Sequence, residues 1–342
     1  MKRNRILSLA MTLLLALTLV PMFSITAGAA TTIEVSTIEQ LKDALATAQE
    51  GDMINIDNVQ GYIALHDELN IPKGVTVTNT AYFVINENAV INNKGILINS
   101  GAMVMDNNAT IFNSGILNII GDYSIIYIND NCVVNNSGEL NNKGTIISSA
   151  VIKNSGIFNN AESITSSNLI ENTGTLNSTG GITNNGTIKN SGVLNSNTMY
   201  NNETGIIENT GTFRNTNHLN NGAGTIRNYD KFINDGYFYN GDGTGTVINY
   251  GGSITGNGGW DGNPVIDMST TVKVSASVEK LKGSQNQLTI TITEIYANGS
   301  TKSTAYKIMI NNNAAGVYSV GEYKVYVDTK GNTDIRACYF VK

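Results

Sequence analysis

The chain has 342 residues, 14% of them charged, and its formal net charge is −6. This mildly acidic balance argues against nucleic acid or an anionic membrane as a partner. The two cysteines, Cys132 and Cys338, are far apart in the sequence. We therefore expect two isolated core thiols, with a disulfide as the alternative in an exported protein.

Residues 1–29 have the organisation of a secretory signal peptide. Three cationic residues precede an apolar run from Ile6 to about Val20, and Ala27-Gly28-Ala29 supplies small residues for cleavage before Ala30. A retained membrane anchor is the alternative, but the apolar run is short for a span. The sequence predicts a bacterial protein that is secreted or held at the cell surface, with no membrane insertion after the signal is removed.

The mature chain opens with an expected short strand, a helix and further short strands. Ser36 is the expected N-cap of the helix, with Glu39 three residues later, and the helix should end near Gly51. Its buried face would carry Leu41, Leu45 and Ala48.

A helix between short strands, followed by Leu69-Asn70-Ile71-Pro72-Lys73-Gly74-Val75, forms a recognisable opening over residues 33–78. This stretch resembles the N-terminal cap of right-handed parallel β-helix proteins of the pectin-lyase-like superfamily. The resemblance implies that the helix covers the open end of a solenoid and blocks edge-to-edge association there. From Tyr82 to about Val134 the apolar strands are irregularly spaced, which indicates less regular coils of about 20 residues.

A regular array follows from Leu140 to Phe238. An apolar residue returns every six residues, with Asn or Ser two places later and often Gly four places later. We expect single-residue insertions near Gly205 and Gly222. The expected inward series is Leu140, Ile146, Ile152, Phe158, Ile164, Ile170, Leu176, Ile182, Ile188, Leu194, Tyr200, Ile207, Phe213, Leu219, Ile226, Phe232 and Phe238.

Residue chemistry also repeats at 18 to 19 residues, which predicts a three-sided coil. One column alternates in charge at every step: Lys153, Glu171, Lys189, Glu208 and Arg227. Opposite charges on neighbouring strands are favourable, and like charges are not. A second column consists of Asn154, Asn172, Asn190, Asn209 and Asn228. We expect these asparagines to tolerate left-handed backbone at the bends and to form an amide ladder along the axis. The array resembles Asn-rich repeats of bacterial surface β-solenoid proteins.

The handedness of the coil has two interpretations. The N-terminal resemblance and the general preference for right-handed crossovers favour a right-handed helix. Regular hexads also resemble left-handed hexapeptide solenoids, although those favour other residues around the apolar position.

After the array, the pattern changes twice. Residues 251–264 are rich in glycine, contain Trp260 and indicate a linker, so the solenoid with its cap is expected over residues 30–250. Residues 265–342 contain segments that alternate apolar and polar residues between turns, which is typical of a small β-sandwich. Its strands are expected at Val272–Val278, Leu288–Ile292, Tyr306–Ile310, Tyr323–Val327 and Ile335–Val341.

Parallel β-helices often cleave or bind polysaccharides, so we searched for catalytic groups. Glycoside hydrolysis needs two carboxyl groups close together. In the array, Glu171 and Glu208 belong to the charged column, and Glu162 and Glu203 are about two coils apart. No acid cluster that could hold calcium, no zinc spacing and no phosphate loop is present. We predict no catalytic residues, no metal and no cofactor, and the sequence assigns no binding residues.

Three weaker signals have ordinary structural interpretations. His66 and His218 lack partners at motif spacing and are expected at the surface, and residues 241–245 form a single glycine-rich turn. Ice-binding solenoids present regular ranks of threonine. The outward columns here are expected to be Val151, Leu169, Thr187, Ile206 and Thr225, and Thr145, Ser163, Gly181, Met199 and His218. Neither is a regular Thr rank.

The sequence therefore predicts an exported, non-catalytic β-solenoid with a structural, adhesive or carbohydrate-contacting role at the cell envelope. A polysaccharide or another cell-wall component is the expected partner, and the C-terminal sandwich is the expected recognition module because its loops are free to vary. The competing function is a polysaccharide lyase or glycoside hydrolase with its site in the irregular coils. The acids available there are Asp106, Asp122 and Asp130. Oligomeric state and mode of surface attachment are not encoded in any recognisable motif.

Overall fold

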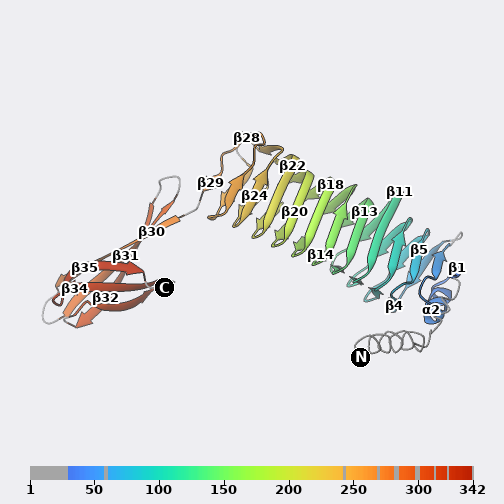
Figure 1. Ribbon diagram of the computed structural model, residues 1–342, viewed down its shortest axis with the longest axis horizontal. Coiled ribbons are helices and arrows are strands. Elements are labelled where there is room, and N and C mark those ends of the chain that lie inside the picture. The colour runs from blue at the N-terminus through green and yellow to red at the C-terminus, as the bar shows by residue number, and fades with distance from the viewer. Residues whose placement is uncertain are drawn as a thin grey trace, which may run out of the picture.

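The computed structural model describes residues 30–57, 61–241, 244–267, 270–280, 285–296, 301–311, 313–321 and 323–340. The expected signal peptide lies outside these residues. Figure 1 shows a long stack of short strands, with helix α2 (Ile38–Thr47) at its N-terminal end and a group of antiparallel strands after its C-terminal end. None of the helices in these ranges is long and apolar enough to cross a membrane.

The stack is a parallel β-solenoid with three faces, because each coil contributes one short strand to each face. The third face is a continuous 11-stranded sheet. Its strands are β4 (Glu68–Ile71), β7 (Val90–Asn93), β10 (Thr110–Asn113), β12 (Val133–Asn136), β14 (Val151–Asn154), β17 (Leu169–Asn172), β19 (Thr187–Asn190), β21 (Ile206–Asn209), β23 (Thr225–Asn228), β26 (Thr246–Asn249) and β29 (Ile266–Asp267).

The first and second faces join into one 18-stranded sheet, because several strands continue around the corner between them. The first face holds β1 (Thr32–Val35), β2 (Met53–Ile56), β5 (Thr76–Asn79), β8 (Ile96–Asn99), β15 (Ile157–Asn160), β24 (Lys231–Asn234) and β27 (Ser253–Thr255). The second face holds β3 (Tyr62–Leu65), β6 (Tyr82–Ile85), β9 (Ala102–Met105), β16 (Ser163–Ser166), β25 (Tyr237–Asn240) and β28 (Trp260–Gly262). Both faces share β11 (Ile116–Ile128), β13 (Glu139–Ser148), β18 (Thr175–Asn184), β20 (Val193–Asn201) and β22 (Thr212–Asn221).

The hexad explains each strand of the regular coils. Successive side chains of a strand point to opposite sides, so in β19 Ile188 and Asn190 point inward while Thr187 and Lys189 point outward. The aliphatic column Ile152, Ile170, Ile188, Ile207 and Ile226 is fully buried and in register from coil to coil. Burial of each such side chain contributes about 1.5–3 kcal/mol. The three-sided coil of 18 to 19 residues is thus confirmed.

The amide ladder is confirmed, and it is longer than the predicted column. Along the third face each asparagine donates its Nδ2 to Oδ1 of the asparagine one coil later, at 2.6–2.9 Å, in the series Asn93, Asn113, Asn136, Asn154, Asn172, Asn190, Asn209, Asn228 and Asn249. The expectation of left-handed backbone at these asparagines was wrong. Positive φ among the described non-glycine residues occurs at Asn88, Asn108 and Asn131, outside the ladder.

The register differs from the expected one at a single coil. Ile182 pairs with Met199, which is fully buried, and Tyr200 points outward. The coil from Ile182 to Met199 is one residue shorter than the regular coil of 18 residues. The next corner, from Asn201 to Ile206, is two residues longer than the equivalent corner from Asn184 to Thr187. A one-residue slip exchanges the two faces of a strand, so the expected inward position of Tyr200 was wrong.

The ends of the solenoid also differ from expectation. At the N-terminus, Thr37 rather than Ser36 caps α2, and its hydroxyl accepts from the Gln40 amide at 3.2 Å. The helix ends at Thr47, before Gly51. At the other end, the expected linker contains β27 and β28, which pair in parallel with β24 and β25. The ring of Trp260 packs 4.3 Å from that of Phe238, so this segment completes the core of the solenoid.

The C-terminal region consists of two antiparallel three-stranded sheets. One sheet contains β30 (Thr270–Lys280), β31 (Gln285–Tyr296) and β32 (Thr301–Asn311), and the other contains β33 (Gly316–Val320), β34 (Tyr323–Lys330) and β35 (Asp334–Phe340). Residues of both sheets share one hydrophobic core, which includes Leu288, Ile290, Val325 and Val327. Strand β33 was not expected. Cys132 and Cys338 are both free thiols, and burial raises the pKa of each.

Candidate binding surfaces

The acids considered for catalysis differ in their surroundings. Asp106 accepts a hydrogen bond from Asn129 Nδ2 at 2.9 Å, and Asp130 is exposed in the turn after β11. The side chain of Asp122 lies outside the described residues. Glu162 is at a corner between the first and second faces, whereas Glu203 is at a corner between the second and third. These glutamates therefore lie on different edges of the solenoid.

The charged column is accounted for by ion pairs between coils. Glu208 lies 2.9 Å from Arg227 Nη1 and 3.9 Å from Lys189 Nζ, and Glu171 lies 4.0 Å from Lys153 Nζ. The predicted alternation is confirmed by the register of these strands. Within the described residues there is no group of three or more His, Cys, Asp and Glu side chains that could hold a metal ion.

The two histidines differ in their surroundings. His66 is exposed in the turn between β3 and β4, as expected. His218 is half-buried on the second face, with its ring 6.0 Å from Tyr200 and 5.7 Å from Tyr237. Rings that stack along the axis cover each other's faces, so His218 contributes to a column that stabilises neighbouring strands. Of residues 241–245, two lie outside the described ranges.

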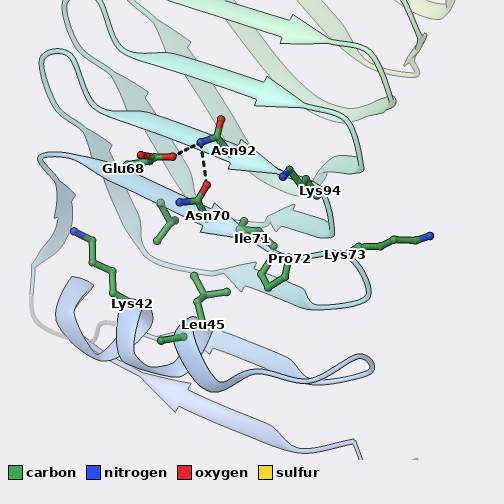
Figure 2. A pocket seen from close by; sticks show the side chains of 11 residues that line it. Lys42, Leu45, Glu68, Asn70, Ile71, Pro72, Lys73, Asn92 and Lys94 are labelled. Atoms are coloured by element: carbon green, nitrogen blue, oxygen red, sulfur yellow. Dashed lines mark hydrogen bonds between the residues drawn. The ribbon is translucent and has the colours of Figure 1, made fainter.

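A groove of about 470 Å³ lies between α2 and the first strands of the third face (Figure 2). Its apolar lining includes Leu45, Leu69 and Pro72. Its polar side contains Asn92, which donates through Nδ2 to Glu68 Oε1 at 2.7 Å and to Asn70 Oδ1 at 3.0 Å. Glu68 is the one carboxylate among the residues that line this groove, and it accepts from an amide, so the lining lacks the paired carboxyls of a glycosidase.

The lysines of this groove differ in their pairing. Lys42 forms an ion pair with Asp67. Lys73 and Lys94 are exposed and have no side-chain partner within the part of the chain that the structure describes. These two lysines also belong to a second, more open furrow of about 720 Å³ that continues along the corner between the third and first faces.

Stacking explains the furrow. A Cβ on Gly115, Gly138 or Gly156 would lie 2.1 Å from the carbonyl oxygen of the corner glycine one coil earlier. Only glycine allows this approach, so the corner carries no side chain at these positions. The furrow is bordered by aliphatic side chains of the first face, among them Ile96, Ile116 and Ile157.

The second face is the least charged surface of the solenoid. From β3 to β25 its outward positions hold no Lys, Arg, Asp or Glu, and the first acid is Asp261 on β28. The outward column that begins with Thr145 was expected to include Met199, and in the structure Thr198 takes this position. The outward residues are Tyr62, Ala64, Tyr82, Val84, Ala102, Val104, Ile125, Tyr127, Thr145, Ile147, Ser163, Thr165, Gly181, Thr183, Thr198, Tyr200, His218, Asn220, Tyr237 and Tyr239.

Sequence reasoning missed this face, although its signal was available. The hexads predict which positions point outward, and the absence of charge can be found by following both outward positions of the second strand in every coil. The single-coil slip at Met199 hid the pattern, because a register without the slip places Tyr200 in the core and Met199 on the surface. Comparisons with protein-family models, with curated proteins and with solved structures gave no match.

Proposed function

We propose that the protein is an exported, non-catalytic β-solenoid with a structural, adhesive or carbohydrate-contacting role at the cell envelope. The observation that carries this proposal is the use of polar groups for stacking. The amides of the ladder pair with one another from coil to coil, and the charged column forms ion pairs between coils. Side chains committed in this way hold a rod together and are not available for acid–base chemistry.

Export is part of the same proposal. It is supported by the charged, apolar and small-residue segments of residues 1–29, in the order of a signal peptide. Membership of the pectin-lyase-like superfamily is likewise proposed, on the likeness of residues 33–78 and the position of α2 at the solenoid end. N-terminal sequencing of protein recovered from the culture medium or envelope should begin at Ala30.

The test of the function is a binding assay combined with an activity assay on the full-length chain. Immobilised uronic-acid and neutral glycans are incubated with the protein, and retained protein and released sugar are measured together. We expect retention on at least one glycan with no released product. Release of sugar that disappears in an Asp106→Asn or Asp130→Asn variant would establish the lyase or hydrolase alternative instead.

A further inference from the structure

From β3 to β25 the second face of the solenoid presents an uncharged surface that core packing does not require. Its outward positions are equivalent to those that hold the ion-paired column on the third face. Six of its large hydrophobic side chains are between 39% and 62% exposed: Tyr62, Tyr82, Tyr127, Ile147, Tyr200 and Tyr237. Several large apolar side chains exposed on one uncharged face are a feature of interaction surfaces.

Hydroxyl-bearing and small residues predominate in the middle of the face beside Ile147, and tyrosines occupy both ends and the coil of Tyr127. The middle coils present Thr145, Ser163, Thr165, Gly181, Thr183 and Thr198. Towards the N-terminus the face presents Tyr62 and Tyr82, and towards the C-terminus Tyr200 and Tyr237. The coils repeat about every 4.8 Å along the axis, so these groups form two parallel rows, one with Tyr62, Tyr82 and Thr145 and the other with Tyr127, Ile147 and Thr183.

We infer that the second face binds an extended, neutral polysaccharide chain that lies along the solenoid axis. This inference rests on the proposed carbohydrate-contacting role and adds the location and the class of sugar. A neutral ligand is favoured because the face offers no charge to pair with an anionic one. Tyrosine combines apolar area with a hydroxyl, and the Ser and Thr side chains donate and accept hydrogen bonds, which matches a chain with apolar ring faces and hydroxyl edges.

A second protein chain fits the surface less well. Cores of protein interfaces are depleted in serine relative to the rest of the surface, whereas the centre of this face carries Ser163 among threonines. Self-association through the face is therefore the competing outcome of the test.

The test compares two polymers that share a backbone and differ in charge, hydroxyethylcellulose and carboxymethylcellulose, together with neutral xylan, mannan and chitin. Binding of the full-length chain is measured by affinity electrophoresis at low and high salt. We expect at least one neutral polymer to bind in a manner insensitive to salt, and carboxymethylcellulose to bind more weakly than its neutral counterpart. Stronger binding to the anionic form, or a blank result on every neutral polymer, would overturn the inference.

Matched variants locate the site. Thr183→Lys places a charge on the second face, and Thr187→Lys places the same charge on the third face, four residues later. Tyr127→Ala removes an exposed ring of the second face, and Phe112→Ala removes one from the third. We expect each second-face variant to weaken binding about tenfold because a buried unpaired charge or a lost ring costs contact energy. The control variants should bind like the unmodified protein, and all four should retain its circular dichroism spectrum.

The outcomes separate this inference from the proposed function. If glycan binding persists unchanged in Thr183→Lys and Tyr127→Ala, the protein contacts carbohydrate elsewhere, and the second-face site is wrong while the function stands. If no glycan of any charge binds, the inference and the carbohydrate-contacting form of the proposed function are both wrong, and a structural or adhesive role is left. A concentration-dependent dimer in analytical ultracentrifugation that is abolished by Thr183→Lys, without glycan binding, would assign the face to a second copy.

Discussion

Each buried asparagine between the two ends of the third-face ladder pairs in two directions, whereas Asn93 Oδ1, at the first position, has no hydrogen-bond partner among the described residues. Asn172 accepts from Asn154 Nδ2 at 2.7 Å, and its own Nδ2 donates to Asn190 Oδ1 at 2.7 Å and to the Val193 carbonyl at 2.9 Å. A buried amide without partners is costly, and stacking supplies partners at every coil. The polar interior is thus compatible with a stable rod, although composition alone suggests disorder.

Removal of one ladder amide should therefore destabilise the protein strongly. Asn172→Ala leaves Asn154 Nδ2 and Asn190 Oδ1 without their side-chain partner, and we expect a loss of about 2–4 kcal/mol in the free energy of unfolding. The measurement is urea denaturation followed by circular dichroism. Asn202→Ala is the control, because its amide also donates to an asparagine, Asn185, but is exposed. Equal losses in the two variants would contradict the account.

The corner glycines offer a second test at the residue scale. In Gly156→Ala the new Cβ would lie 2.1 Å from the Gly138 carbonyl oxygen, whereas a Cβ on Gly181 meets no atom within 4 Å. Overpacking of this kind costs about 3 kcal/mol, while Gly→Ala at an unstrained position is neutral or slightly stabilising. Melting temperatures should fall clearly in the first variant only. A similar fall in Gly181→Ala would show that the close approach is not the cause.

At the scale of the strand, the outward charged column favours the observed pairing of neighbouring strands over shifted pairings. Glu208 lies between Lys189 and Arg227, and all three side chains are partly exposed. Each exposed pair contributes little by itself, but a wrong register would place like charges opposite each other. A second outward row, Asn118, Asn141, Asn159, Asn177 and Asn195, runs along the first face, with amides that donate towards the preceding coil.

Charge reversal in this column should be destabilising and salt-dependent. Glu208→Lys would place three cations in line, and we expect a loss of about 1–2 kcal/mol at low salt that high salt partly restores, because salt screens exposed charges. Melting temperatures at two salt concentrations provide the measurement. Glu203→Lys, at an exposed corner position, is the control. A loss in Glu208→Lys that does not respond to salt would show that the column acts through packing and not through charge.

Most strands of the regular coils could be predicted, because the apolar residues that recur every six positions are the ones that the structure buries. The apolar–polar alternation predicts which side chain of each hexad is inward, and Ile152 to Ile226 occupy those places. The predicted register failed at the coil that contains Met199, which has one residue fewer before Met199 and two more between Asn201 and Ile206. A repeat pattern in the sequence does not reveal a deletion that a nearby insertion compensates. The prediction failed again at residues 251–264, where many glycines indicate a linker, although Ile254 and Trp260 keep the inward apolar positions opposite Phe232 and Phe238.

The candidate surfaces could be predicted less well than the fold. The residues that line the groove beside α2 come from the helix and from β4 and β7. Whether these residues lie side by side depends on how α2 packs against the first coils. The uncharged second face can be derived from the sequence only once the register of every coil is known. The corner furrow follows from the glycine column, because an absent side chain leaves space along the axis.

At the scale of the whole molecule, three functions are distributed over three parts of the solenoid. The interior ladder holds the coils together, the charged column of the third face favours one register, and the second face is where we infer that a polysaccharide binds. The C-terminal sheets, with their own core, are the recognition module that the sequence predicts. The account's central claim is that this molecule binds envelope carbohydrate and does not cleave it.

The most direct measurement is co-sedimentation of the full-length protein with insoluble envelope polysaccharide, with soluble sugar assayed in the same supernatant over time. The account predicts that protein moves into the pellet in a saturable manner while no sugar is released above the protein-free control. Release of sugar in proportion to the amount of protein, or protein that remains entirely in the supernatant, would contradict it.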